Sequence, residues 1–258
     1  MNRLLITASL TLVATLFLSA CTEDEEIRTV RLAVDVPYEP FQYQDSDDNL
    51  TGFEIELGNA VCEEMELDCE WVIEPWDDII PSLLSNRYDV IFSSMSITSS
   101  RAERVLFSEP YYTTPSGWFV RDGSDVNPDD QSSLADLRVG VQRDTTQDEY
   151  VTDYLEGIDV RRYGSADDLA LDLEAGRLEA VFLDFPVGDQ TILGRPGFAT
   201  VGEPVNEPAS IFGEGVGAAF RPDDEALAET FNEGLRRVKE NGTYEAIMDG
   251  YFNYDIMI

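Results

Sequence analysis

A run of hydroxyl side chains that ends in an arginine is the part of the chain best suited to bind a small molecule. Ser93, Ser94 and Ser96 lie close together, and Arg101 follows them. Hydroxyl and backbone N–H groups beside a guanidinium suit a carboxylate, which the planar fork of arginine can hold through two parallel hydrogen bonds. The same residue types also form turns and helix caps. The run therefore indicates an anion site that other positions must support.

Two further polar segments could belong to the same site. Thr145 and Thr146 place hydroxyl groups at an expected helix start, where backbone N–H groups also favour an anion. Asp184 comes directly after an expected strand. Its carboxylate could hold an ammonium group, or it could cap the helix that follows.

The overall composition excludes several classes of protein. The 258 residues contain 52 Asp and Glu against 17 Lys and Arg, with no histidine, so the formal net charge is −35. Without histidine, Ser-His-Asp catalysis, Cys-His catalysis and histidine-ligated metal sites are excluded. We expect no catalytic residue, no metal site and no cofactor. The negative charge repels phosphate backbones, so nucleic acid is not an expected partner.

The acidic residues are spread along the whole chain and do not mark one binding patch. So many carboxylates repel one another, and salt screens this repulsion strongly once the Debye length falls to about 3 Å near 1 M. We therefore interpret the acidity as an adaptation to high salt.

Expected strands and helices alternate around these polar residues. Strand patterns cover residues 30–34, 70–73, 89–92, 138–141, 160–163 and 178–183. Helical patterns cover residues 53–65, 76–84, a segment after 146, 166–174 and 227–238. This alternation predicts an α/β fold whose ligands bind at the carboxyl ends of strands.

The N-terminus has the pattern of an export signal. A cationic start precedes an apolar run that ends in Leu18-Ser19-Ala20-Cys21, which resembles a bacterial lipobox. We expect residues 1–20 to be a lipoprotein signal peptide, Cys21 to carry lipid, and residues 21–26 to be an acidic tether at the cell envelope, in or facing the periplasm. The alternative is an ordinary secretory signal with an incidental cysteine.

Lipidation of Cys21 would leave two cysteines, Cys62 and Cys69, in an oxidising compartment. A disulfide that closes so small a loop contributes about 2–3 kcal/mol if it is unstrained. The alternative is a pair of buried thiols.

The order of motifs along the chain is more specific than any single motif. The segments that carry this order are Asp35-Val36-Pro37-Tyr38, Gly52-Phe53-Glu54-Ile55, Ser93-Ser94-Met95-Ser96 with Arg101, Thr145-Thr146-Gln147, and Glu240-Asn241-Gly242-Thr243-Tyr244. From about residue 30 to residue 252 the sequence closely resembles the periplasmic amino-acid-binding proteins of ABC importers (solute-binding protein family 3), which include the histidine and lysine-arginine-ornithine binders. The spacing of Cys62 and Cys69 also resembles the disulfide of the cationic-amino-acid binders.

This resemblance implies a two-lobed periplasmic-binding-protein fold of type II, hinged by two crossovers. Lobe 1 would comprise residues 27–113 and 215–258, and lobe 2 residues 114–214. The lobes would close on an L-amino acid, and a membrane permease would recognise the closed monomer.

The resemblance also assigns roles to the polar residues. Arg101 would hold the ligand α-carboxylate with groups from the loops around Ser96 and Thr146, and Asp184 would hold the α-ammonium. Tyr38 and Trp76 would flank the ligand side chain, with Asp35 near its far end. The implied ligand-binding residues are Asp35, Tyr38, Trp76, Ser93, Ser94, Ser96, Arg101, Thr146 and Asp184.

The residues around the expected ligand side chain favour some amino acids over others. Tyr38 and Trp76 could enclose a guanidinium by cation–π contact, with Asp35 as its counter-charge, which favours arginine, lysine, ornithine or histidine. Trp76 could instead cover an aliphatic stem, and glutamine binders of the family also have the acid. Gln142, Arg143 and Asp144 stand where the histidine binder has apolar and small residues, and Arg143 could disfavour a cation.

Two other classes remain open at this point. Some relatives of the fold are dehydratases that act on cyclic carboxylic acids, although an intact ammonium site at Asp184 argues against this. Sensor domains share the fold but are usually joined to membrane-spanning and signalling segments.

Overall fold

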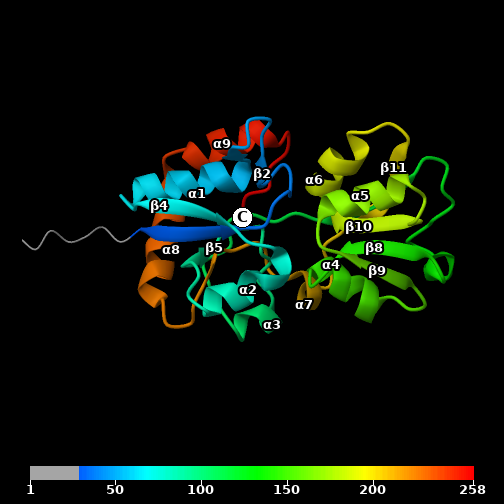
Figure 1. Ribbon diagram of the computed structural model, residues 1–258, viewed down its shortest axis with the longest axis horizontal. Coiled ribbons are helices and arrows are strands. Elements are labelled where there is room, and N and C mark those ends of the chain that lie inside the picture. The colour runs from blue at the N-terminus through cyan, green and yellow to red at the C-terminus, as the bar shows by residue number, and fades with distance from the viewer. Residues whose placement is uncertain (1–28) are drawn as a thin grey trace, which may run out of the picture.

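The computed structural model describes residues 29–258 as two α/β lobes that lie side by side (Figure 1). The expected signal peptide, Cys21 and the acidic tether lie outside the described residues. No helix in the described part of the chain is long and apolar enough to cross a membrane.

The first lobe is built on a five-stranded mixed sheet with the order β4-β1-β5-β12-β6. Strands β4 and β5 are parallel to β1, whereas β12 is antiparallel to β5 and β6. The strands are β1 (Val30–Val34), β4 (Cys69–Ile73), β5 (Val90–Ile91), β6 (Leu106–Phe107) and β12 (Ala219–Phe220). A small antiparallel hairpin, β2 (Tyr43–Gln44) and β3 (Leu50–Thr51), lies outside this sheet.

Helices cover both faces of the first sheet because its strands alternate apolar residues between two cores. Leu32 of β1 packs with Leu57 and Phe231 in one core, and the adjacent Ala33 packs with Ile79 and Leu83 in the other. The helices of this lobe are α1 (Phe53–Glu64), α2 (Trp76–Leu84), α3 (Ser99–Ala102), α8 (Glu225–Glu240) and α9 (Thr243–Tyr251).

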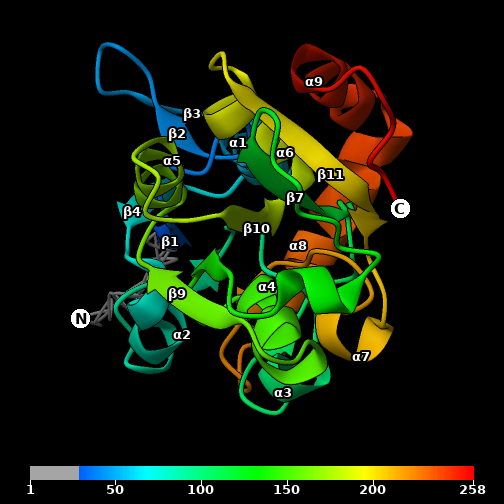
Figure 2. The ribbon, with the colours of Figure 1, turned by 90° about the vertical axis from the view of Figure 1, so that its right-hand side faces the viewer.

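The second lobe repeats this plan with the strand order β11-β7-β10-β8-β9. Strands β8, β9 and β10 are parallel, and β7 is antiparallel to β10 and β11. Figure 2 looks onto this lobe, with α5 and α4 on opposite sides of the sheet. Its elements are β7 (Ser116–Arg121), β8 (Arg138–Gln142), α4 (Thr146–Glu149), β9 (Asp159–Tyr163), α5 (Ala166–Glu174), β10 (Ala180–Asp184), α6 (Phe185–Gly188), β11 (Phe198–Val205) and α7 (Ala209–Phe212). Short helical turns span Gln131–Leu134, Tyr150–Tyr154 and Asp189–Leu193.

The chain passes twice between the lobes, once between β6 and β7 and once between β11 and β12. The two crossovers run beside each other, because Tyr112 and Val216 form an antiparallel bridge. This pairing joins the lobes through two adjacent extended segments. The exact lobe boundaries stay a prediction.

The expected α/β alternation is confirmed, and the elements that were predicted differ from the observed ones mainly at their ends. Residues 30–34, 76–84 and 166–174 match β1, α2 and α5. The strand expected at 178–183 begins only at Ala180, because the backbone N–H of Leu178 still bonds to Asp172 in the turn after α5. Among the elements that were not predicted are the strands β6, β7, β11 and β12 and the helix α9.

The disulfide between Cys62 and Cys69 is confirmed, with an S–S distance of 2.08 Å. It joins the last turn of α1 to the first residue of β4. The alternative of two buried thiols is therefore wrong.

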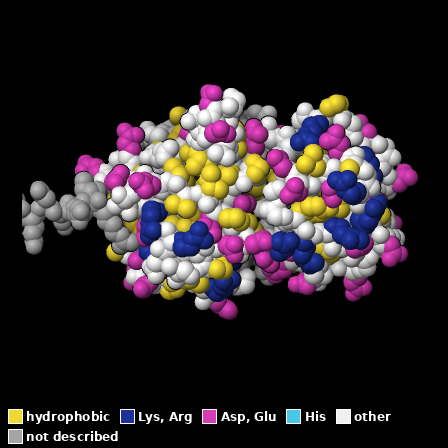
Figure 3. All heavy atoms as spheres, in the orientation of Figure 1, with side chains coloured by type: hydrophobic (Ala, Val, Ile, Leu, Met, Phe, Trp, Pro, Cys, Tyr) yellow, Lys and Arg dark blue, Asp and Glu magenta, His cyan; other side chains and the backbone are white. Residues whose placement is uncertain are grey.

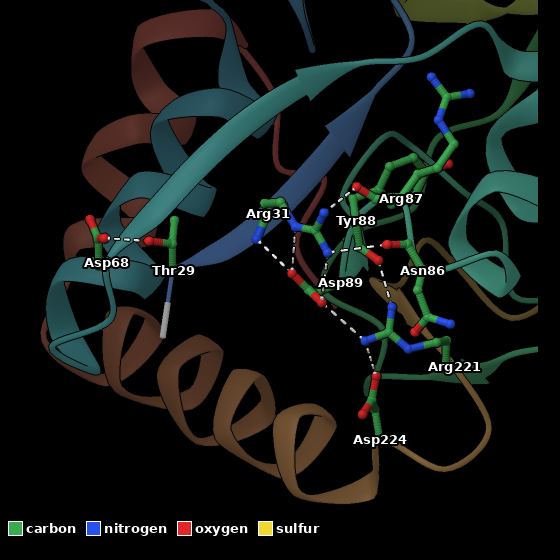
Figure 4. Close-up of polar contacts among 9 residues, drawn as sticks. All are labelled: Thr29, Arg31, Asp68, Asn86, Arg87, Tyr88, Asp89, Arg221 and Asp224. Carbon is green, nitrogen blue, oxygen red and sulfur yellow. Dashed lines mark hydrogen bonds and ion pairs between the residues drawn. The ribbon is translucent and has the colours of Figure 1, made fainter. Parts of the chain in front are cut away.

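A network of buried ion pairs ties the first sheet to the start of α8 (Figure 4). Asp89 is 1% exposed and accepts hydrogen bonds from Arg31 Nε and Arg221 Nη2, both at 3.1 Å. Arg221 also pairs with Asp224 at 2.5 Å and donates to the carbonyl of Tyr88. A buried carboxylate thus has cationic partners from two separate segments.

The remaining acidic side chains lie mostly on the surface, where Figure 3 shows them scattered over both lobes of this face. Among residues 29–258, no group of three or more Asp, Glu, Cys or His side chains is arranged to hold a metal ion.

Candidate ligand-binding site between the lobes

One cavity between the lobes contains every side chain that the sequence indicated as ligand-binding. Its empty space, including the part that is open to solvent, is about 320 Å³. The lining residues that were predicted are Asp35, Tyr38, Trp76, Ser93, Ser94, Ser96, Arg101, Thr146 and Asp184. Their roles toward a ligand stay predictions.

The cavity forms where the parallel strands of both sheets end. Asp35 directly follows β1, and Ser93 comes shortly after β5. In the second lobe Gln142 is the last residue of β8, and Asp184 is the last residue of β10. Carboxyl ends of parallel strands share one sheet edge, so the two edges face each other across the cleft.

Arg101 supplies the positive charge of the cavity. Its Nη1 atom donates to the carbonyl of Ser96 at 3.0 Å, and its Nη2 atom donates to the carbonyl of Asp144 at 3.2 Å. The guanidinium lies 5.2 Å from the ring centre of Trp76, within range of a cation–π contact. Desolvation lowers the pKa of Arg101 to about 10, so it stays cationic at neutral pH.

Asp184 supplies one negative charge and is held by neutral donors. Its Oδ2 accepts from the Tyr38 hydroxyl at 2.6 Å, and its Oδ1 accepts from Gln147 Nε2 at 2.9 Å. Asp184 precedes α6, yet its side chain makes no capping hydrogen bond, so the helix-cap interpretation is wrong. Burial raises the pKa of Asp184 to about 6, although the hydrogen bonds from Tyr38 and the charge of Arg101 oppose this.

Asp35 supplies a second negative charge at another wall of the cavity. It is 8% exposed, and its Oδ2 accepts from Gln142 Nε2 of the opposite lobe at 2.9 Å. Its backbone N–H donates to the Ser93 hydroxyl at 2.9 Å, which joins the loops after β1 and β5. Burial raises the pKa of Asp35 to about 6, against the lowering effect of the Gln142 hydrogen bond.

A buried acid below the cavity positions the first serine loop. Ser94 has a φ of 53°, an uncommon conformation for a residue with a side chain. Its backbone N–H donates to Glu54 Oε1 at 3.0 Å, and Glu54 also accepts from the hydroxyls of Tyr111 and Tyr112. Burial raises the pKa of Glu54 to about 7. Because Tyr111 and Tyr112 lead into the first crossover, Glu54 connects the loop to the hinge.

The second loop begins a helix, as predicted. Thr145 caps α4 by accepting the backbone N–H of Asp148 at 3.2 Å, and Thr146 is buried at the cavity. Arg143 is not among the cavity-lining residues, because its guanidinium forms an ion pair with Asp77 of the first lobe. Its charge is therefore compensated by Asp77 outside the cavity lining, which weakens the sequence-based argument against a cationic ligand.

The two lobes are closed over the cavity. In the described part of the chain, five pairs of residues make direct polar contacts across the cleft: Tyr38 with Asp184, Asp35 with Gln142, Arg101 with Asp144, Trp76 with Asp144, and Asp77 with Arg143. A closed cavity with a cation at one wall and carboxylates at others can exclude water and hold a small zwitterion.

Four lining residues were not among the implied ligand-binding residues: Gln42, Gln142, Thr145 and Gln147. Thr145 and Gln147 belong to a motif that the sequence had already singled out. Gln142 was visible only as a departure from the family pattern, and nothing in the sequence pointed to Gln42.

Comparison with known proteins agrees with this architecture. The family of bacterial extracellular solute-binding proteins, family 3, matches residues 30–254. The L-arginine-binding protein of Pseudomonas aeruginosa is 38% identical over 89% of this chain and 90% of its own length. The lysine/arginine/ornithine-binding periplasmic protein of Escherichia coli K12 is 35% identical over 88% of this chain and 89% of its own length.

A solved structure agrees as well. A Salmonella typhimurium periplasmic binding protein described as highly specific for arginine superposes with a TM-score of 0.82 at 30% identity, covering 88% of this chain and all of that one. These relatives are binding proteins, and their two-lobed type II fold is the fold of this chain. The chain belongs to family 3 of the bacterial extracellular solute-binding proteins.

Proposed function

We propose that this protein captures a cationic L-amino acid in the cleft between its lobes and presents it to an ABC importer. The observation that carries the proposal is the charge composition of the cavity. Arg101 contributes one positive charge, whereas Asp35 and Asp184 contribute two carboxylates. An amino-acid zwitterion with a cationic side chain has the complementary set of one negative and two positive groups.

Each charge of the ligand then has a partner. The α-carboxylate would face Arg101, the serine loop and the start of α4, where hydroxyl and backbone N–H groups converge. The α-ammonium would face Asp184, which Tyr38 and Gln147 hold in place. The side chain would extend along Tyr38 toward Asp35.

Trp76 contributes in a way that the sequence did not suggest. One side of its ring faces the guanidinium of Arg101. Trp76 would therefore position the residue that holds the ligand carboxylate as well as cover the ligand side chain.

The sequence adds a cellular setting to the proposal. Export and a lipid on Cys21 would keep the protein at the membrane beside its permease, and the acidic surface would suit a saline environment. Palmitate labelling of cells that express the wild type or Cys21→Ala tests the anchor. Label in the wild type alone supports it.

Calorimetric titration of the purified protein with the twenty amino acids and ornithine, at low and at molar KCl, tests the ligand. Arginine, lysine or ornithine should bind most tightly. Arg101→Ala should weaken binding more than about 100-fold, because a buried carboxylate loses its partner. Arg104→Ala changes an exposed arginine of the same segment outside the ligand cavity and should leave binding unchanged.

Other outcomes would contradict the proposal. Tighter binding of glutamine would keep the class and refute the role of Asp35. No binding by folded protein, with turnover of a cyclic carboxylic acid such as prephenate, would favour an enzyme.

A further inference from the structure

Gln142 lies beside Asp35 in the cavity, at the end of β8, and its side-chain amide has a defined orientation. Its Nε2 atom donates to Asp35 Oδ2 at 2.9 Å and to the carbonyl of Gly164 at 3.2 Å. Both partners are acceptors, so only the NH₂ group of the amide can face them. The amide oxygen must therefore point to the other side.

The Oε1 atom of Gln142 has no hydrogen-bond partner in the described part of the chain. Gln142 is 2% exposed and belongs to the cavity lining. Among the described residues, the one fully buried side-chain polar atom without a hydrogen bond is Asp224 Oδ2. No hydrogen bond in this part of the chain uses Gln142 Oε1, so this atom is not fully buried. The oxygen therefore keeps some exposed surface, and because Gln142 lines the cavity, a bound ligand is the donor expected to meet it.

We propose that Gln142 and Asp35 together select a guanidinium over a primary ammonium group. The proposal rests on the function proposed above and narrows it to arginine. Asp35 supplies the negative charge, and Gln142 supplies a neutral acceptor next to it on the opposite lobe. A planar guanidinium carries five N–H donors and can meet both acceptors at once.

A lysine or ornithine ligand would use this pair less well. Its ammonium is a compact charge that would approach Asp35 and leave Gln142 Oε1 without an N–H donor in the same geometry. The Gln142 oxygen would then be enclosed without a donor, which costs binding free energy. Sites built around a ligand hydrogen bond discriminate strongly against analogues that cannot make it.

Calorimetry with arginine and lysine tests the proposal in the wild type and in Gln142→Met. This substitution keeps the side-chain length and removes both the oxygen and the NH₂ group of the amide. The wild type should prefer arginine by about tenfold or more. Gln142→Met should lose about tenfold in arginine affinity and less than about threefold in lysine affinity, so that the preference collapses. Gln131→Met, at an exposed glutamine of the second lobe, should behave as the wild type.

The outcomes separate this proposal from the function on which it rests. Equal affinity of the wild type for arginine and lysine overturns the role of Gln142 without any variant, and so does an equal loss for both ligands in folded Gln142→Met. A folded wild type that binds no cationic amino acid refutes the proposed function itself. Circular dichroism of the unliganded proteins reports folding independently.

Discussion

Buried carboxylates in two regions of this molecule have different kinds of hydrogen-bond partner, cationic in one region and neutral in the other. In the ion-pair network of the first lobe, which we call the frame, Asp89 accepts hydrogen bonds from Arg31 and Arg221. In the cleft, Asp184 and Asp35 accept hydrogen bonds from neutral tyrosine and glutamine side chains. Within the described chain, no ion pair includes either cleft carboxylate.

This difference separates the structural charge of Asp89 from two charges that line the cavity and are available to a ligand. Glu54 is also held by neutral donors, but it does not line the cavity. Burying a carboxylate is costly unless a cation or several donors compensate it. The frame contains its own cations, although the whole chain has only 17 Lys and Arg against 52 Asp and Glu. In the cleft, neither Asp35 nor Asp184 forms an ion pair with a cation from the described part of the protein, so we expect a ligand to supply the cation.

Breaking the frame should have the largest effect, and it should act on stability. Asp89→Asn removes the charge shared by two arginines, one of them buried, and should lower the free energy of unfolding by about 3–5 kcal/mol. Chemical denaturation of the unliganded protein measures this. A loss below about 1 kcal/mol would mean that the network contributes little to folding.

The matching change in the cleft should act on binding instead. Asp184→Asn should weaken arginine binding by about 100-fold, because the α-ammonium loses its counter-charge. Its unliganded stability should change by less than about 1 kcal/mol, since loss of a desolvated charge offsets one weakened hydrogen bond. Calorimetry and denaturation of the same sample decide this. A large loss of stability with intact binding would mean that Asp184 is a structural charge, like Asp89, and not a ligand-binding one.

The pH dependence of binding sharpens the same contrast. The pKa values of Asp35 and Asp184 are raised to about 6 in the unliganded cleft. Protons therefore compete with a cationic ligand below that pH, so affinity should be constant above pH 7 and fall by up to about tenfold per group per pH unit below pH 6. Titrations between pH 5 and pH 8 test this.

A variant shows which carboxylate is responsible. Asp35→Asn should bind arginine more weakly at pH 7 and show a shallower decline toward pH 5, because one titrating group is gone. Binding that strengthens on acidification would contradict ionised carboxylates as the cation partners.

The smallest effect is expected at the exposed ion pair across the cleft. The side chains of Arg143 and Asp77 are 43% and 36% exposed, and such pairs contribute at most about 1 kcal/mol. Asp77→Asn should weaken ligand binding by less than about fivefold at low salt and not at all in molar KCl. A larger effect that persists in salt would assign closure to this pair.

The sequence was most informative where local pattern decides the structure. The strands before Asp35, Ser93 and Asp184 were recognisable from their apolar runs, so these side chains could be assigned to strand ends. Their position at one edge of an α/β sheet follows from that assignment.

What the sequence did not reveal depends on contacts between distant segments. Gln142 and Asp35 are 107 positions apart, and their hydrogen bond exists only because the lobes are closed. The cation–π contact between Arg101 and Trp76 likewise joins two loops whose spacing no periodicity encodes. Strands β7 and β11 were missed for a related reason: β7 is buried along most of its length and β11 contains Gly202 and Pro204, so neither alternates regularly.

The most direct test of the central claim compares arginine with citrulline, which has nearly the same shape but a neutral end group. Calorimetric titration of the wild-type protein at pH 7.5 should give an affinity for arginine at least about 30-fold higher than for citrulline, because citrulline leaves Asp35 without a cation. Equal or tighter binding of citrulline would contradict the account, since the second carboxylate of the cleft would then have no part in choosing the ligand.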